Sequence, residues 1–417
     1  MSRWLARAVV AGAALAGLAA PVAAKDDQKG DKLPEAASPD KVKPGQTALL
    51  KAANGMSYFL RVPKGYDAKA GARLIVFLHG SNMNGLSYVR SFEAKRWASD
   101  DILCCPNGET DTKGQPGTDP YGANNFTEDK SMELVAEVTA DVQKALKCTI
   151  SYCGGHSQGG FLTYAVVLRH PDMFKGALPM AGDCWMENEP NLWADNPEVA
   201  KVQHEIPFAV VHGRNDPVVQ FAQGEHAYDC FRADGWQKVR FFTPERAGHM
   251  FMVYPVDEVL DWLDAMNGRN EKKTAELCEK WAKDGEWGWC VAAARASSAV
   301  PQKYVKLAED AAAKAAPGIA EAMKGKPMDW IPKWLEFWRV FGGTDAAKPL
   351  VDEYLGKRAG QRAQGRDLLM QTQVLYRSNK AAEADAILPQ ILETVPQSYE
   401  AYYAWKWLSE KAAKGKK

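Results

Sequence analysis

The chain of 417 residues has no excess of charge of either sign, because 52 Lys and Arg side chains balance 52 Asp and Glu side chains. Binding to nucleic acid or to an anionic membrane surface calls for a basic excess, so the composition supports neither kind of partner. With 34 Gly and 23 Pro, the chain also lacks the biased composition of collagen-like and low-complexity proteins. A hydrophobic share of 46% is enough to bury a core, and the length predicts one or two domains.

Long apolar runs are missing except near the N-terminus, where residues 8–20 follow a short basic start. This run is short for an anchoring helix, which needs about 20 apolar residues to span a bilayer. Small residues then lead up to Ala24, as a signal peptidase requires. We therefore expect residues 1–24 to be an export signal, and the mature protein to be periplasmic or extracellular with no membrane span. Residues 25–44 are polar and are predicted to be a disordered leader.

Clustered metal-binding spacings are absent among the eight cysteines. In an exported protein, an even number of cysteines permits disulfides instead. Cys278 and Cys290 lie symmetrically about Asp284-Gly285, and a helical hairpin turning there would bring their sulfurs together. We predict a disulfide between them, and we expect no metal and no other cofactor.

The segment 45–267 alternates short apolar runs with longer amphipathic ones. Two strand-like runs flank Asn54-Gly55, which is a strong hairpin signal. Apolar runs separated by segments of helical period are typical of an α/β fold, in which helices cover both faces of a mostly parallel sheet. The predicted strands are residues 47–52, 56–62, 74–78, 101–105, 150–153, 177–181, 208–212 and 239–242, with a helix at 128–146.

The strands stop near residue 267, and residues 268–417 are predicted to form an all-helical domain. Trp330, Trp334 and Trp338 follow one another at helical spacing, which predicts core packing rather than a ligand platform. The segment 368–405 weakly resembles a tetratricopeptide unit, which leaves open a protein partner for this domain. Turn signals lie at Gly285, Pro301, Pro317, Gly325-Lys326-Pro327, Gly342-Gly343 and Pro396.

The sequence Gly155-His156-Ser157-Gln158-Gly159 lies between a predicted strand and a predicted helix. In that context, Gly-x-Ser-x-Gly predicts a sharp turn that lifts the serine hydroxyl above the sheet. The flanking glycines avoid clashes in this turn. At a helix N-terminus, the N–H of Gln158 can face developing negative charge. We therefore expect Ser157 to be a catalytic nucleophile.

A serine hydroxyl needs a base to take its proton and an acid to orient that base. Among the seven histidines, His249 lies in a loop after the last predicted strand, where a base can reach over the sheet edge. Asp216 follows the predicted strand 208–212, so the chain order is Ser, Asp, His. Asp183 is a rival acid because it also follows an apolar run, but it shares its turn with Trp185, which suits a substrate loop.

This constellation resembles the α/β-hydrolase superfamily of serine esterases over residues 45–267. The turn at His79 resembles the family's oxyanion-hole segment, which implies a second donor N–H at Ser81, or at Asn82, beside that of Gln158. The lack of a long inserted cap is similar to secreted feruloyl esterases and polyhydroxyalkanoate depolymerases, and to the carboxylesterase/phospholipase branch. The helical domain is not part of that pattern.

The resemblance implies acyl transfer on a small-molecule or polymeric carboxylic ester. Ser157 would attack the ester carbonyl while His249 takes its proton, and water would then release the acyl group. Loops at the same sheet edge would line the pocket, which makes Tyr121, Asn124 and Trp185 the candidate substrate-binding residues.

Two other functions stay open. A serine peptidase on the same fold would usually add a propeller or a cap, and neither is visible in the sequence. A non-catalytic binding protein would work through its helical domain, and it would be expected to have lost Ser157, Asp216 or His249, all of which are present.

Overall fold

The computed structural model describes residues 32–95, 100–116, 119–184, 205–233, 235–298 and 300–414. The predicted export signal and Trp185 lie outside these residues. The chain divides into two compact units. The α/β unit contains the described residues up to Tyr228 together with residues 238–263, and the helical unit contains residues 229–237 and those from Asp264 onward. None of the helices in the described ranges is both long and apolar enough to cross a bilayer.

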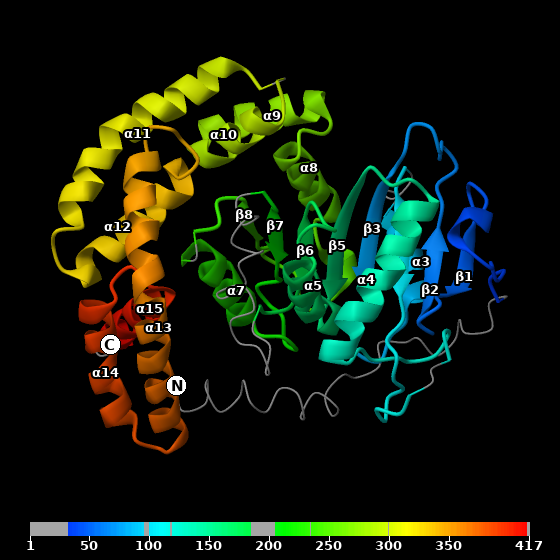
Figure 1. Cartoon of the computed structure of the whole chain (residues 1–417), viewed down its shortest axis with the longest axis horizontal. Coiled ribbons are helices and arrows are strands. Elements are labelled where there is room, and N and C mark those ends of the chain that lie inside the picture. The colour runs from blue at the N-terminus through cyan, green and yellow to red at the C-terminus, as the bar shows by residue number, and fades with distance from the viewer. Residues whose placement is uncertain are drawn as a thin grey trace. The chain divides into compact units, whose positions relative to one another are not determined.

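An eight-stranded sheet organises the α/β unit (Figure 1). Its spatial order is β1-β2-β4-β3-β5-β6-β7-β8. The pairs β1–β2 and β2–β4 are antiparallel, and all later neighbours are parallel, which confirms the predicted mostly parallel sheet. The strands are β1 (Thr47–Lys51), β2 (Ser57–Arg61), β3 (Arg73–Leu78), β4 (Ile102–Pro106), β5 (Ile150–His156), β6 (Ala177–Met180), β7 (Phe208–Val211) and β8 (Val239–Phe242).

The predicted hairpin at Asn54-Gly55 joins β1 to β2. Lys51 pairs with Ser57 across the turn, and Gly55 has a φ of 90°, which glycine adopts without steric cost. The side-chain oxygen of Asn54 accepts the N–H of Met56 at 3.0 Å, which closes the turn.

The central parallel strands are buried along their length. From Leu74 to Leu78 every side chain of β3 has no exposed surface, as expected for strands covered on both faces. Helices α4 and α5 pack against each other and lie side by side in Figure 1. The helices that follow the strands are α3 (Gly85–Lys95), α4 (Glu128–Ala145), α5 (Gln158–Arg169), α7 (Phe221–Ala233) and α8 (Val256–Met266).

Residues 32–44 are ordered, so the prediction of a disordered leader is wrong for this part of it. The N–H of Ala36 donates to the carbonyl of Leu49, and the N–H of Leu49 donates to the carbonyl of Pro34, both at 3.0 Å. A short helix, η1 (Pro39–Lys41), follows. Backbone pairing with an edge strand holds this segment, and a polar composition gives no sign of such pairing.

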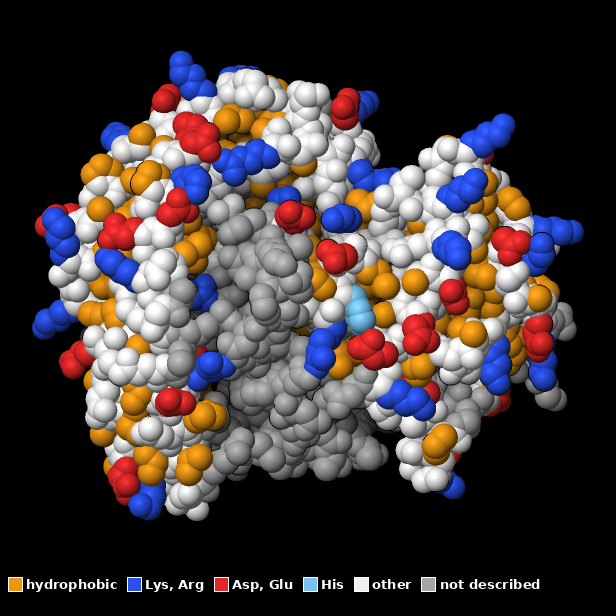
Figure 2. Space-filling view, viewed as in Figure 1, with side chains coloured by type: hydrophobic (Ala, Val, Ile, Leu, Met, Phe, Trp, Pro, Cys, Tyr) orange, Lys and Arg blue, Asp and Glu red, His pale blue; other side chains and the backbone are white. Residues whose placement is uncertain are grey.

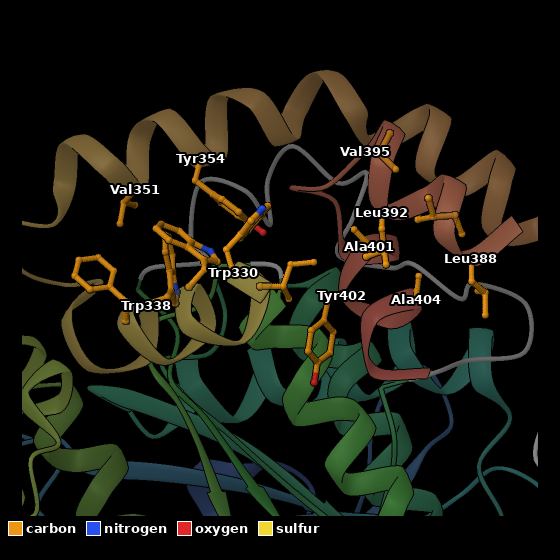
Figure 3. Packing of buried hydrophobic residues seen from close by; sticks show 14 of the residues in the cluster. Trp330, Trp338, Val351, Tyr354, Leu388, Leu392, Val395, Ala401, Tyr402 and Ala404 are labelled. Atoms are coloured by element: carbon orange, nitrogen blue, oxygen red, sulfur yellow. The ribbon is translucent and has the colours of Figure 1, made fainter. Parts of the chain in front are cut away.

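The helical unit is built around tryptophan. Trp330, Trp334 and Trp338 are each 2–3% exposed, and they pack in one apolar cluster (Figure 3). The rings of Trp334 and Tyr354 stack with their centroids 4.3 Å apart. The prediction that this stripe is core is therefore confirmed. The helices are α9 (Glu271–Lys283), α10 (Trp287–Ala296), α11 (Gln302–Ala322), α12 (Pro327–Phe341), α13 (Lys348–Arg377), α14 (Ala381–Thr394) and α15 (Tyr399–Lys414).

Helix α11 continues through Pro317, so the turn predicted at this residue is wrong. A proline inside a helix removes one backbone hydrogen bond, and the other turns of this 21-residue helix outweigh that loss. The other predicted turns fall between helices, except that Pro327 is already the first residue of α12. Helix α13 spans 30 residues, longer than either helix of a tetratricopeptide repeat of about 34 residues, which speaks against that resemblance.

Helices α9 and α10 form the hairpin predicted at Gly285. Cys278 and Cys290 are both fully buried, and Sγ of Cys290 lies 3.4 Å from the carbonyl oxygen of Cys278. The adjacent Cys278 thiol and burial raise the pKa of the Cys290 thiol. Both side chains are thiols in this structure, so the disulfide between them stays a prediction.

Charges of both signs are mixed on the molecular surface. Figure 2 shows Lys and Arg interspersed with Asp and Glu over the coloured part of the face that it draws. This mixing agrees with the balanced composition.

Candidate active site

A strained turn joins β5 to α5. Ser157 has φ 56° and ψ −119°, and non-glycine residues rarely adopt a positive φ. Its N–H donates to the carbonyl of Met180 at 2.9 Å, and its own carbonyl accepts the N–H of Phe161 at 3.1 Å. One residue therefore ends the strand ladder and begins the helix. This geometry matches the strand-to-helix turn that the Gly-x-Ser-x-Gly motif predicts.

Close packing requires the glycines on both sides of Ser157. A Cβ atom at Gly155 would lie 2.2 Å from the carbonyl oxygen of Gly159, and one at Gly159 would lie 2.2 Å from that of Leu78. Both distances are far shorter than a van der Waals contact. Glycine therefore lets the start of α5 lie directly against the end of β3.

His249 and Asp216 form a hydrogen bond, in which Nδ1 of His249 donates to Oδ2 of Asp216 at 2.7 Å. The other carboxylate oxygen accepts the N–H groups of Val218 and Val219 at 2.8 and 2.9 Å. Burial alone would raise the pKa of Asp216, but the bonds from His249 and the two amides hold that pKa below its usual value. The carboxylate is therefore charged and orients His249, whose Nε2 stays available to take a proton.

Two loops at the carboxyl edge of the sheet carry this pair. The N–H of Asn215 donates to the carbonyl of Ala247 at 3.0 Å, and a Cβ atom at Gly213 would lie only 2.4 Å from the same oxygen. The hydroxyl of Tyr254 donates to the carbonyl of Gly248 at 3.0 Å. These contacts hold the loop after β8 against the loop after β7, so that His249 meets Asp216.

His249 also lies beside the turn that carries Ser157. Its ring centroid is 4.7 Å from that of His156, the residue before the serine. His156 is buried, with Nδ1 2.8 Å from the hydroxyl of Tyr88. Burial, together with the neighbouring His249, lowers the pKa of His156 to about 3, so this second ring is neutral. The structure therefore places the His249–Asp216 pair beside the residue that precedes Ser157, and a catalytic triad of these three residues stays a prediction.

Asp183, the rival acid, contacts a different histidine. Its Oδ1 lies 2.8 Å from Nδ1 of His226 in α7. The tertiary structure thus pairs Asp216, and not Asp183, with His249.

The segment after β3 lies against the serine turn. A Cβ atom at Gly80 would be 3.4 Å from Cβ of Ser157. The N–H of Asn82 donates to Oδ1 of Asn125 at 2.9 Å, whereas the N–H of Ser81 has no acceptor in the part of the chain that the structure describes. Of the two expected alternatives, the geometry favours Ser81 as the partner of Gln158 in an oxyanion hole.

Two of the three candidate substrate-binding residues, Tyr121 and Asn124, make hydrogen bonds within the protein. The hydroxyl of Tyr121 accepts the N–H of Leu33 at 3.0 Å. Asn124 is 1% exposed, and its side-chain amide donates to two carbonyls of its own loop. Both residues therefore stabilise the loop itself. The third candidate, Trp185, lies outside the described residues, and a substrate contact by any of the three stays a prediction.

A set of exposed apolar side chains borders these loops and was not foreseen from the sequence. Met83 lies two residues after Ser81, Val218 two residues after Asp216, and the others directly follow His249. The sequence does contain one sign of this surface, because the residues directly after His249 are apolar, which is unusual for an exposed loop. In the described part of the α/β unit, the exposed large hydrophobic residues are Met83 (39%), Val218 (37%), Met250 (55%), Met252 (42%) and Val253 (49%).

Metal-ligating residue types also occur near Asp183. Cys184 and His226 bring a thiol and an imidazole within 4.8 Å of each other, and Cys230 lies one turn further along α7. These are residue types that zinc accepts. Hydrolysis of an ester by a serine, a histidine and an aspartate needs none of them.

A protein-family comparison matches most of the α/β unit. Residues 66–267 match the family model described as Phospholipase/Carboxylesterase. A curated relative, the probable feruloyl esterase C of Aspergillus terreus, is 27% identical over 184 residues, which are 41% of this chain and 58% of the relative. The chain therefore matches little more than half the length of that relative.

Solved structures also match part of the chain. Acyl-protein thioesterase 2 from Zea mays is 23% identical, and the match covers 50% of this chain and 97% of that one with a TM-score of 0.40. The feruloyl esterase module from Clostridium thermocellum, complexed with sinapinate, is 16% identical, and the match covers 53% of this chain and 88% of that one with a TM-score of 0.36.

Proposed function

Because residues 66–267 belong to the phospholipase/carboxylesterase family of α/β-hydrolases, we propose that the chain hydrolyses carboxylic esters through an acyl-enzyme on Ser157. The observation that carries the proposal is the 2.7 Å hydrogen bond between His249 and Asp216, which forms beside a serine whose φ is 56°. A serine on a strained turn, an oriented imidazole and a buried carboxylate are the groups that nucleophilic acyl transfer needs.

In the first half of the reaction, Ser157 Oγ attacks the ester carbonyl carbon and His249 Nε2 takes the hydroxyl proton. The carbonyl oxygen becomes an oxyanion, which the N–H groups of Ser81 and Gln158 stabilise. Asp216 stabilises the imidazolium that forms. The tetrahedral intermediate then collapses, and the alcohol leaves with the proton from His249.

In the second half, water replaces the alcohol. His249 takes a proton from the water as its oxygen attacks the acyl carbon, and the same two N–H groups stabilise the second oxyanion. The carboxylic acid leaves and Ser157 regains its proton. Every proton in this cycle passes through His249, so no cofactor is needed.

The exposed apolar side chains around the site support an ester with an apolar acyl or aromatic group. Met250, Met252 and Val253 follow the base directly, and each is at least 42% exposed. Covering such side chains with an apolar substrate group would remove their surface from water, at about 25 cal/mol per Å². A small polar ester would gain nothing from them.

We also propose that the protein is exported and that cleavage after Ala24 removes the leader. The basic start, the short apolar run and the small residues before Lys25 support this. Mass spectrometry of the protein recovered from its host should find Lys25 at the N-terminus, and a mature chain that retains residues 1–24 would contradict the proposal.

Fluorophosphonate labelling and ester turnover test the chemistry. The wild-type protein should hydrolyse p-nitrophenyl esters and should be labelled at Ser157. Ser157→Ala should abolish both and leave the fold intact, because the change removes one hydroxyl oxygen. Ser38→Ala is a matched control, since the Ser38 hydroxyl contacts only Asp40 near the start of the described chain.

Peptide amides and esters offered in parallel distinguish the serine peptidase alternative. Higher kcat/KM on amides would replace the esterase proposal with a peptidase. Undiminished labelling and turnover in the Ser157→Ala variant would contradict both.

A further inference from the structure

Three successive residues, Asn124, Asn125 and Phe126, join the two backbone segments that carry the expected oxyanion donors. We call residues 124–126 the strap. On one side lies the segment of Ser81, and on the other lies Gln158. Each residue of the strap makes its own contact with one of these two segments.

The strap binds the Ser81 side through two residues. The N–H of Asn124 donates to the carbonyl of Met83 at 2.8 Å. The side-chain oxygen of Asn125 accepts the N–H of Asn82 at 2.9 Å, and its amide group donates to the side-chain oxygen of Asn82 at 3.0 Å. Asn82 has a φ of 59°, a conformation that asparagine tolerates better than most residues. The reciprocal pair holds this turn directly after Ser81.

The strap binds the other side through the side chain of Gln158. The carbonyl oxygen of this side chain accepts the N–H of Phe126 at 3.1 Å, and its amide donates to the carbonyl of Phe126 at 3.1 Å. One side chain therefore satisfies both polar groups of one peptide residue. The backbone N–H of Gln158, which is the expected oxyanion donor, belongs to the same residue.

The strap is itself fixed to the body of the α/β unit. Asn125 and Thr110 exchange two backbone hydrogen bonds, at 2.9 and 3.2 Å. The ring of Phe126, which is 6% exposed, lies with its centroid 4.4 Å from that of His79. A strap held in this way can transmit the position of one donor segment to the other.

We propose that the side chains of Asn125 and Gln158 are positioning residues, which set the separation of the Ser81 and Gln158 N–H groups through the strap. The inference rests on the proposed function, because it assigns these N–H groups to an oxyanion hole. The polar groups of both side chains bond to the protein itself, to Asn82 and to Phe126. Their effect appears in the transition state, because a displaced donor stabilises the oxyanion less while the bound ester is held as before.

The expected size of the effect follows from known oxyanion holes. Complete loss of one donor costs about 10²- to 10³-fold in kcat, and a displacement of about 1 Å in catalytic geometry costs about 10²-fold. Asn125→Ala and Gln158→Met keep both backbone donors but remove the side-chain bonds to Asn82 and to Phe126. We expect each to lower kcat by about 10- to 100-fold and to change KM little.

A boronic acid inhibitor gives the readout that separates positioning from general destabilisation. Its tetrahedral adduct with Ser157 places an oxygen in the oxyanion hole, so its inhibition constant should rise by the factor by which kcat/KM falls. Rates are divided by the concentration of active sites, which is measured by titration with fluorophosphonate. Unfolded protein therefore does not lower the calculated kcat. Asn54→Ala is the matched control, because Asn54 lies in the β1–β2 turn and contacts α4; it should leave kcat unchanged.

Gln158→Glu adds a second measurement that does not depend on loss of a side chain. A protonated carboxyl group can accept from the N–H of Phe126 and donate to its carbonyl, as the amide does, whereas a carboxylate repels the carbonyl. The ratio of variant to wild-type kcat should therefore rise as the pH is lowered from about 8 to about 5, toward the ordinary Glu pKa of about 4.3.

The outcomes are distinguishable. Wild-type kcat and boronate affinity in both Asn125→Ala and Gln158→Met, or a pH-independent ratio for Gln158→Glu, would overturn the role of the strap while the esterase proposal stands. A wild-type protein that neither hydrolyses esters nor is labelled at Ser157 would overturn the proposed function itself.

Discussion

The imidazole rings of His156 and His249 lie with their centroids 4.7 Å apart, yet they meet different electrostatic surroundings. His156 is buried, and its pKa is lowered to about 3. His249 instead holds a hydrogen bond to the charged carboxylate of Asp216. Because His156 is neutral, it places no second positive charge beside the His249–Asp216 pair.

The pairing of His249 with Asp216 predicts which carboxylate matters. Removing the orienting acid of a serine protease leaves the imidazole in the wrong tautomer and costs about 10⁴-fold in kcat. Asp216→Asn should lower kcat by a similar order, whereas Asp183→Asn should change it little, because Asp183 contacts His226. Steady-state kinetics on purified variants with native circular dichroism checks this, and the reverse ranking would show that the acid is Asp183.

Buried His79 predicts a loss of stability in acid. Its Nδ1–H donates to the carbonyl of Gly80 at 2.8 Å, and its Nε2 accepts the N–H of Gly108 at 2.9 Å. Burial lowers the pKa of His79 to about 4. This folded-state pKa is below the unfolded value of about 6.5, so the stability linked to His79 is fully present above that pH and is lost as the pH falls toward the folded pKa.

The expected loss through His79 between pH 7 and pH 5 is about 2 kcal/mol in the free energy of unfolding. Urea denaturation at both pH values measures it. In His79→Gln, which has no group that titrates there, the pH-dependent loss should be smaller by about that amount. An unchanged difference between the two pH values in this variant would show that other groups control the acid sensitivity.

The apolar border of the site predicts a preference among acyl chains. Met250→Ser combined with Met252→Ser should lower kcat/KM on long-chain p-nitrophenyl esters by about 10-fold, the effect of roughly 1.4 kcal/mol of lost apolar contact, and should leave the acetate ester nearly unaffected. Kinetics across a chain-length series would measure this. Equal losses on short and long esters would indicate damage to His249 instead of a lost contact with substrate.

The α9–α10 hairpin predicts a disulfide in protein recovered from an oxidising compartment. Its intact mass without reductant should be lower by the mass of two hydrogen atoms than after reduction, and peptide mapping should link Cys278 to Cys290. Cys278→Ser should abolish the link and lower stability by about 2 to 4 kcal/mol. Alkylation of both thiols in unreduced, unfolded protein would contradict the prediction.

The buried tryptophan cluster predicts which substitutions destabilise the helical unit. Trp334 is 2% exposed, and Trp334→Ala should cost about 3 to 5 kcal/mol in the free energy of unfolding, because it removes a large side chain and leaves a cavity. Met370, which is 58% exposed, provides the control, and Met370→Ala should stay within about 0.5 kcal/mol. Chemical denaturation compares the two, and equal effects would contradict the assignment of the core.

The sequence predicts a structural feature correctly where interactions between neighbouring residues cause that feature. Asn54-Gly55 predicts the β1–β2 hairpin because glycine adopts the required φ without strain. The Gly-x-Ser-x-Gly motif likewise predicts the turn at Ser157, since its flanking glycines face backbone atoms of the same strand–helix unit and its neighbour strand. The tryptophan stripe predicts a core because residues at helical spacing share one face of a single helix. Pro317 does not end α11, because the helix around it outweighs one local helix breaker.

What the sequence alone determined about this protein is the alternation of strands and helices, the all-helical C-terminal part and the sharp strand-to-helix turn at Ser157, all of which follow from short-range patterns. Only the tertiary structure decided that Asp216 and not Asp183 reaches His249, that residues 34–36 pair with an edge strand, and that residues 124–126 join the segments of Ser81 and Gln158. The first and third of these relationships depend on which loops lie next to one another at the carboxyl edge of the sheet, and the order of the strands determines this. Residues as distant in sequence as Asn82 and Asn125 become partners only after the strands between them have paired.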